Sequence, residues 1–150
     1  MQFLRLDHIA YVVDEFECSL PIFEKALQVP ASSVETVPGQ RVDVVFLKSD
    51  PFLIEIVRPH VGNRPLQRFL KKRRSPCLHH VAFSVSDLIT TIRYLEKENY
   101  KFIQTTPQTG SSGREICFLE PSCTNGVLIE LCKLPDVKLI RNSAMINVIE

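Results

Sequence analysis

Two histidines of this chain lie in short apolar segments of matching sequence. His8 lies in "LDHIAYVV", residues 6–13, and His80 lies in "LHHVAFSV", residues 78–85. Each is followed further along the chain by a glutamate in another apolar segment: Glu55 in "FLIEIVRP" and Glu130 in "GVLIELCK". Burying an unpaired carboxylate costs several kcal/mol, so both glutamates require a compensating partner. We predict that this partner is a divalent metal ion.

The predicted ligands limit the choice of metal and suggest its role. Two imidazole nitrogens and two carboxylate oxygens suit Zn, Co, Ni, Mn or Fe(II). If an ion that prefers six ligands is held only by His8, Glu55, His80 and Glu130, two positions stay open for a substrate. The alternative is a set of core residues, with hydrogen-bonded histidines and salt-bridged glutamates. Because side chains alternate along a strand, His79 is predicted to point away from the site.

These residues occupy equivalent places because the chain contains an internal repeat. A shift of 72 residues superposes Leu6 on Leu78 and His8 on His80. A shift of 75 then aligns "LIEI", residues 53–56, with "LIEL", residues 128–131. A repeat of this length predicts two copies of one supersecondary unit.

Each copy is predicted to be a β-α-β-β-β module. Its first strand carries the histidine, and helices follow at about residues 15–28 and 87–99. Because proline removes a backbone donor, Pro21 predicts that the first helix begins at Ser19. The remaining strands are expected near residues 34–37, 41–48, 52–58, 101–105, 114–120 and 126–133. The expected fold class is α+β, with two tandem modules forming a curved sheet around a metal-binding cavity.

The modules account for most of a single domain that spans residues 1–150. Module one covers residues 4–58, a linker helix covers 59–76, module two covers 77–133, and a C-terminal extension covers 134–150. The extension could pack on a partner subunit. The linker contains the basic run Lys71, Lys72, Arg73 and Arg74. This run is interpreted as a solvated face or as a site for the phosphates of a ligand.

Composition and charge narrow the partners. The chain has 18 Lys plus Arg against 17 Asp plus Glu, a formal net charge of +1, which provides no general attraction for nucleic acid or an anionic membrane. We therefore expect a small-molecule partner. The five cysteines are odd in number and have no zinc-finger spacing, and there is no secretory signal or membrane-spanning apolar run. A cytoplasmic location is expected.

The paired His and Glu residues of the two modules resemble those of the vicinal oxygen chelate superfamily. This superfamily includes glyoxalase I, extradiol dioxygenases and fosfomycin or bleomycin resistance proteins. Within it, "VPGQRVDVVFL", "LHHVAFSVSD" and "NGVLIEL" are most similar to the methylmalonyl-CoA epimerase family. The resemblance covers residues 4–133. It implies an isomerase that moves a proton alpha to the thioester carbonyl of an acyl thioester, with a divalent ion at His8, Glu55, His80 and Glu130. We also expect a homodimer.

The resemblance further implies two catalytic bases, Glu130 and an acidic residue at the position of Asp43, on opposite faces of the reacting carbon. Inversion requires one base on each face of that carbon, so the division of roles is chemically consistent. Asp43 alternates with Val42 and Val44 in a predicted strand, and we expect it either to project into the cavity or to face solvent.

Three other functions remain open from the sequence. A glyoxalase I-type lyase or isomerase with a thiol-conjugated substrate would use the same ligand positions. An extradiol dioxygenase matches less well, because its Fe(II) site has two histidines and one carboxylate. A non-catalytic small-molecule binding or resistance protein would have the same fold without stoichiometric metal.

Overall fold

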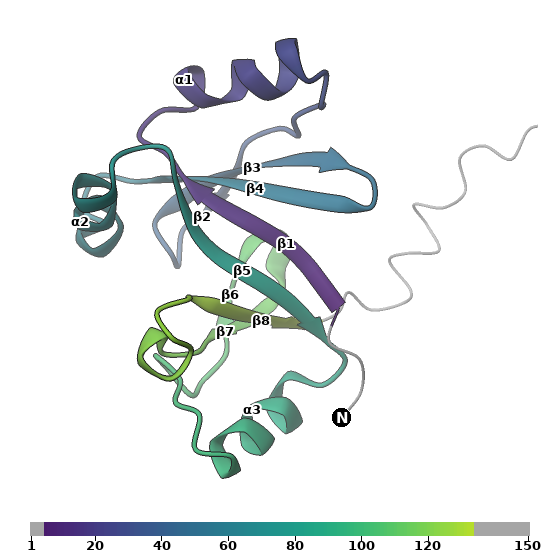
Figure 1. Cartoon of the computed structure of the whole chain (residues 1–150), viewed down its shortest axis with the longest axis vertical. Coiled ribbons are helices and arrows are strands. Elements are labelled where there is room, and N and C mark those ends of the chain that lie inside the picture. The colour runs from purple at the N-terminus through teal and green to yellow at the C-terminus, as the bar shows by residue number, and fades with distance from the viewer. Residues whose placement is uncertain (1–4, 134–150) are drawn as a thin grey trace, which may run out of the picture.

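The strands of the protein form one curved sheet. The computed structural model describes residues 5–133. In this part of the chain the strands lie in the order β2-β3-β4-β1-β5-β8-β7-β6, and the sheet curls around a concave face (Figure 1). The strands are β1 (Arg5–Val12), β2 (Glu35–Val37), β3 (Val42–Ser49), β4 (Phe52–Pro59), β5 (Cys77–Val85), β6 (Gln108–Thr109), β7 (Glu115–Phe118) and β8 (Ile129–Lys133). The predicted α+β class is confirmed.

The two halves of the sheet have equivalent topologies. β1 and β5 lie side by side at the centre and run antiparallel. β4 pairs in parallel with β1, and β8 pairs in parallel with β5. Moving outward, β4-β3-β2 on one side matches β8-β7-β6 on the other. The internal repeat therefore folds as two modules joined through their first strands.

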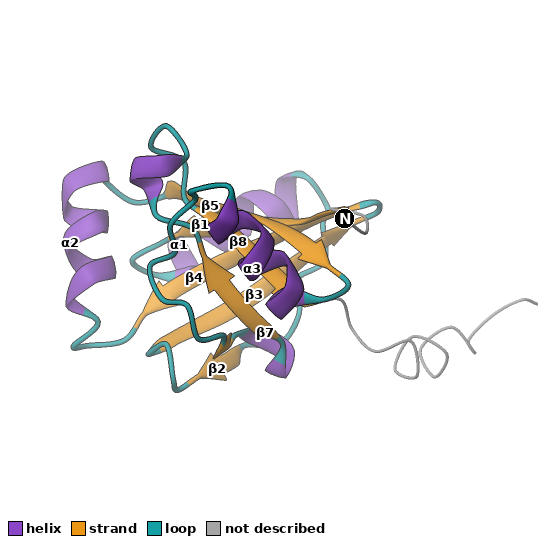
Figure 2. Ribbon diagram, turned by 90° about the horizontal axis from the view of Figure 1, so that it is seen from below, coloured by secondary structure: helices purple, strands orange, loops and turns teal. Residues whose placement is uncertain are grey.

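Two helical segments cover the face of the sheet opposite the concave face (Figure 2). α1 (Phe16–Pro21) continues as a π-helix, η1 (Ile22–Ala26), and α3 (Leu88–Lys97) is its counterpart in the second half. Phe16 packs with Val45 of β3, and Leu88 packs with Leu131 of β8. Because the helices bury this face, the concave face is left for a ligand.

The first helix begins at Phe16, which agrees with the predicted range of about residues 15–28. The start at Ser19 that Pro21 indicated is wrong, and Pro21 lies inside the helix. Proline cannot donate the hydrogen bond of a regular turn, and the helix continues beyond it with π-helical bonding. In this segment the N–H of Leu27 donates to the carbonyl of Ile22 at 3.0 Å.

The linker contains α2 (Arg64–Arg73). The side chain of Asn63 caps its first turn, accepting a hydrogen bond from the N–H of Leu66 at 3.2 Å. Leu70 is buried in a cluster that includes Ala10 of β1 and Val57 of β4. This contact fixes α2 beside the concave face. Among the described residues no helix has the length and apolar character needed to cross a membrane.

One predicted strand is wrong. Residues 101–105 form only an isolated bridge, in which Phe102 pairs with Leu119. The short outer strand of the second half is β6, a few residues later. Phe102 is buried in the cluster under α3, so its apolar character reflects packing of a loop and not a strand. Residues 134–150, for which contact with a partner subunit was considered, lie outside the described residues.

Candidate metal centre

The register of the sheet brings the predicted ligands together. Ala10 of β1 is paired with Glu55 of β4 on one side and with His80 of β5 on the other. In the same way, Ala82 of β5 is paired with Glu130 of β8 and with His8 of β1. Both alanines are completely buried, and their small side chains leave space between the larger polar groups.

The polar atoms of the four residues lie close to one another. His8 Nε2 lies 3.2 Å from His80 Nε2 and 3.5 Å from Glu55 Oε2. Ligand atoms of His8, Glu55 and His80 all lie within 4.8 Å of one another, and Glu130 Oε2 lies 3.5 Å from His80 Nε2. The structure thus gathers all four residues, with Glu130 joined through His80. Each is only 4–5% exposed.

Phenylalanines flank this group symmetrically. Phe46 is paired with Glu55 in the ladder, and its ring meets that of His8 edge to face at 6.3 Å. Phe118 is paired with Glu130, and its ring meets that of His80 edge to face at 5.4 Å. These rings exclude water and restrict the rotation of both imidazoles.

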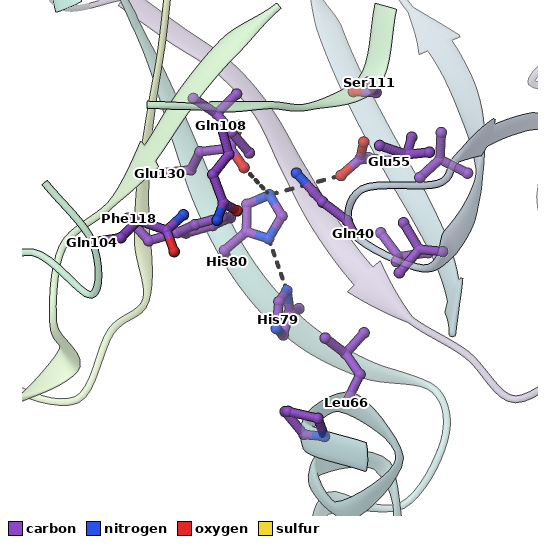
Figure 3. A pocket seen from close by; sticks show the side chains of 16 residues that line it. Gln40, Glu55, Leu66, His79, His80, Gln104, Gln108, Ser111, Phe118 and Glu130 are labelled. Carbon is purple, nitrogen blue, oxygen red and sulfur yellow. Dashed lines mark hydrogen bonds and ion pairs between the residues drawn. The ribbon is translucent and has the colours of Figure 1, made fainter. Parts of the chain in front are cut away.

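A cavity of about 310 Å³ opens onto the group (Figure 3). Glu55 and Glu130 approach His80 from opposite sides of this cavity. Valines of β2, β3 and β4 form an apolar part of the wall, and glutamines and Ser111 supply polar groups. The lining residues include Val37, Val42, Val44, Val57, Gln40, Gln104, Gln108, Pro65, Leu66 and Ser111. The site therefore combines a polar floor with space for an elongated, partly apolar ligand.

Burial and hydrogen bonding displace the pKa values of the group. Burial alone would lower the pKa of His8, but hydrogen bonds to Asp7 and Glu55 raise it to about 10. Burial lowers the pKa of His80 well below its ordinary value and raises the pKa of Glu130 to about 8. His8 is therefore protonated at neutral pH, and its Nε2 lies between His80 and Glu55 at the centre of a buried cluster of acceptors. A divalent cation suits this position, and the donor set fits Zn, Co, Ni, Mn or Fe(II).

The structure corrects the orientation of His79. Ala10 pairs with His80 but Tyr11 pairs with Leu78, so His79 is an extra residue in a β-bulge. The bulge interrupts the strict alternation of the strand, and His79 lines the cavity beside His80. Their Nδ1 atoms lie 2.8 Å apart. Burial lowers the pKa of His79 to about 4, which leaves it uncharged at neutral pH.

The structure does not bring Asp43 to the cavity. Val42 and Val44 line the cavity, so Asp43, which alternates with them, lies on the other face of β3. There Arg58 Nη2 donates to its carboxylate at 2.9 Å, and His60 Nε2 donates at 2.8 Å. These bonds hold the pKa of Asp43 well below its usual range. Projection of Asp43 into the cavity is therefore wrong, and so is the solvent-facing alternative, since the residue is only 9% exposed.

Asp7 and Arg114 also belong to the site, although the sequence analysis did not identify them. Asp7 Oδ1 lies 2.9 Å from His8 Nδ1, and Arg114 binds the same carboxylate. The available signal was the acidic residue directly before His8 in an otherwise apolar segment. The contribution of Arg114, 107 residues away from Asp7, had no local signal.

Comparisons with known proteins identify the superfamily of the chain. The sequence profile of the glyoxalase/bleomycin resistance protein/dioxygenase superfamily matches residues 7–118. The chain belongs to this superfamily. It is 33% identical over 129 residues to the uncharacterized protein YqjC of Bacillus subtilis, covering 86% of this chain and 91% of that protein. It is 30% identical over 127 residues to the mitochondrial methylmalonyl-CoA epimerase of Dictyostelium discoideum, covering 85% and 76% of the two chains.

A solved structure extends this relationship. The crystal structure of methylmalonyl-CoA epimerase from Mycobacterium tuberculosis superposes with a TM-score of 0.80 at 25% identity, over 91% of each chain. The superfamily fold of this chain, with its curled eight-stranded sheet, is thus shared with methylmalonyl-CoA epimerases.

Proposed function

We propose that the protein is a metal-dependent epimerase that moves a proton at the carbon next to a thioester carbonyl, similar to methylmalonyl-CoA epimerase. The observation that carries the proposal is the meeting of two buried histidines and two buried glutamates at one cavity. Similarity to proteins named methylmalonyl-CoA epimerase supports the choice of reaction.

His8, Glu55, His80 and Glu130 are the residues that would hold the metal. When bound, a divalent ion would stabilise the negative charge that develops on the thioester oxygen as the neighbouring C–H bond breaks. The four residues would fix the position of the cation, and the apolar side chains of the cavity wall exclude water from it. Both effects strengthen electrostatic stabilisation inside the cavity.

We assign the proton transfers to Glu130 and Glu55. Inversion requires that one carboxylate takes the proton from one face of the carbon and that a second acid returns a proton to the other face. These two are the carboxylates that line the cavity in the described part of the chain, and they approach from opposite sides. Burial makes Glu130 a stronger base than an exposed glutamate. Asp43 is not retained as a base, since its carboxylate is bound by Arg58 and His60 on the other face of β3.

The basic helix supports coenzyme A as the carrier. Pro65 and Leu66 of α2 line the cavity, while the same helix exposes cations that form no ion pair with another described residue. They are Arg64, Arg68, Lys71, Lys72 and Arg73. Coenzyme A carries phosphates that such cations bind, whereas glutathione has none. We therefore propose that the acyl group enters the cavity while the phosphates lie along α2.

A substitution on this helix tests the choice of carrier. Arg64 and Arg68 are four residues apart and share one face of α2. Their joint replacement by glutamine should raise KM for an acyl-CoA roughly tenfold at unchanged kcat, because two exposed charge contacts made equally in ground and transition states are lost. KM for the corresponding pantetheine thioester should not change. Lys97→Gln, at an exposed position of α3 on the other face of the sheet, is the control. An equal rise in KM for both thioesters would contradict a phosphate site.

The reaction is tested with a single epimer of methylmalonyl-CoA. Metal-loaded protein should form the other epimer, measured with an enzyme that consumes only that product, and chelation should stop the reaction. Methylglyoxal with glutathione tests the glyoxalase alternative, and oxygen uptake with a catechol tests the dioxygenase. Metal-loaded protein that is inactive on every 2-substituted acyl-CoA would contradict the proposal. Protein that binds a small molecule without stoichiometric metal would favour the binding-protein alternative.

The cysteines are the basis for a proposed location in the cytoplasm. All five cysteines are free, and Cys117 and Cys132 are buried. Free thiols fit the reducing cytoplasm that the sequence suggests. The expected homodimer stays a prediction, which light scattering of the purified protein tests directly.

A further inference from the structure

The two candidate histidine ligands have different partners on their outer nitrogens. His8 Nδ1 donates to Asp7 Oδ1 at 2.9 Å, whereas His80 Nδ1 lies 2.8 Å from His79 Nδ1. The internal repeat makes Asp7 and His79 equivalent, since they are 72 residues apart. Both lie at β-bulges, because the β1–β5 register skips Asp7 between Leu6 and His8 and skips His79 between Leu78 and His80. The two β-bulges are thus equivalent, but one places a carboxylate beside its ligand histidine and the other places an imidazole there.

Asp7 is itself held by a bidentate ion pair. Arg114 Nη1 donates to Asp7 Oδ1 and Nη2 donates to Oδ2, each at 2.9 Å. A planar guanidinium paired in this way fixes both the position and the plane of a carboxylate. Asp7 and Arg114 have side chains only 10% and 18% exposed, so water weakens this pair less than it would a surface pair.

Arg114 is anchored in the second module. Its Nε donates to the carbonyl of Lys133 at 2.9 Å, and Nη2 lies 3.0 Å from Cys132 Sγ. Cys132 is two residues from Glu130 on β8. A continuous set of contacts therefore runs from the strand that carries Glu130, through Arg114 and Asp7, to His8 in the first module.

A carboxylate is a stronger hydrogen-bond acceptor than an imidazole. It holds the proton of its histidine on Nδ1, leaves the lone pair on Nε2 and increases the electron density of the ring. His8 receives this support and His80 does not. Arg114 restricts Asp7 to the orientation in which the support is given.

We propose that Asp7 and Arg114 are positioning residues that make His8 the stronger of the two imidazole metal ligands and couple its orientation to the second module. The inference rests on the metal centre of the proposed function and is independent of its substrate.

The test is the dissociation constant of Co(II), measured by chelator competition on the full-length protein. Asp7→Asn keeps the size of the side chain and an acceptor oxygen but removes the charge, and should weaken binding roughly 10- to 100-fold. Arg114→Gln should cause a similar loss, and Arg114→Lys a smaller one. The double variant Asp7→Asn/Arg114→Gln should lose no more than Asp7→Asn alone, because both residues act through one atom of His8. His79→Asn should weaken binding less than Asp7→Asn does.

Matched controls separate positioning from general destabilisation. Glu115 is adjacent to Arg114 and forms an ion pair with Lys133 at 3.5 Å. Glu115→Gln should therefore leave the Co(II) affinity unchanged. Thermal unfolding of the metal-free variants reports folding, and the visible spectrum of bound Co(II) reports the ligand field, which Asp7→Asn should shift.

Several results would overturn the proposal. One is a Co(II) affinity equal to that of wild type in folded Arg114→Lys and Arg114→Gln. Another is a loss of affinity in the double variant that equals the sum of the two single losses. A third is a loss in His79→Asn as large as that in Asp7→Asn. Should Asp7→Asn not fold, the two Arg114 variants decide. Absence of Co(II) binding by wild-type protein would overturn the metal centre itself, and with it the proposed function. Normal binding by wild type and all variants would overturn only the positioning role.

Discussion

Binding of one divalent ion should release about two protons at pH 7. Hydrogen bonds to Asp7 and Glu55 raise the pKa of His8 to about 10 against the effect of burial, and burial raises the pKa of Glu130 to about 8. At pH 7 His8 is then almost fully protonated, and Glu130 is about 90% protonated. A metal ligand must be deprotonated, so the two groups together give up about 1.9 protons. His80, whose pKa is lowered by burial, releases none.

The number of protons displaced also determines how the metal affinity depends on pH. With two protons displaced, the association constant should rise about 100-fold between pH 6 and pH 7, and the slope should decrease above pH 8 as Glu130 ionises. The number of protons is measured by titration calorimetry in buffers of different ionisation enthalpy. Glu130→Gln provides the control, because this variant should release only about one proton. Release of less than half a proton by wild-type protein, or an unchanged release in Glu130→Gln, would refute this reasoning.

Three further outcomes are expected. His80→Ala should remove most of the bound metal in elemental analysis, because His80 lies at the centre of the group, and full occupancy in this variant would contradict its assignment. Ala82→Val should lower the metal affinity, and it should lower the free energy of unfolding by about 1–3 kcal/mol, because Ala82 is completely buried between His8 and Glu130. Unchanged values would show that there is room for a larger side chain between these two residues. The metal-free protein should become less stable as pH rises from 7 to 9, a range in which His79 and His80, whose pKa values are lowered by burial, stay largely uncharged. Both His8 and Glu130 bind protons more tightly in the folded state, so their contribution is present below the unfolded pKa values of 6.5 and 4.5 and is lost as pH rises toward the folded values. Urea unfolding across this range measures the change, and a rise in stability would contradict the assigned direction.

The four ligand residues could be predicted from the sequence because the internal repeat places them at equivalent positions of two modules. Equivalent residues on two first strands must meet when those strands pair antiparallel, and the glutamates follow because each last strand runs parallel to its own first strand. The alternation of side chains then predicts which residues share a face. This reasoning fails at His79, because a bulge adds one residue to the strand and has no local sequence signal here.

Asp43 shows a second limit. Alternation correctly separates it from Val42 and Val44, but valines cover both the cavity wall and the face beneath α1. Apolar character therefore does not distinguish the two faces of β3, and the sequence left both orientations of Asp43 open. Arg114 illustrates a third limit, since a partner over 100 residues away is fixed by tertiary structure alone.

Exchange of the substrate α-proton with solvent tests the proposed reaction most directly. Methylmalonyl-CoA is incubated in deuterated buffer with metal-loaded wild-type protein, and incorporation of deuterium at the carbon next to the thioester is followed by NMR. We expect rapid exchange that is lost on chelation. In Glu130→Gln that retains metal through the remaining ligands, exchange should be slowed about 10² to 10⁴-fold for the epimer whose α-proton Glu130 removes. Metal-loaded wild-type protein that leaves the α-proton of methylmalonyl-CoA and of related 2-substituted acyl-CoAs unexchanged would contradict the proposed reaction.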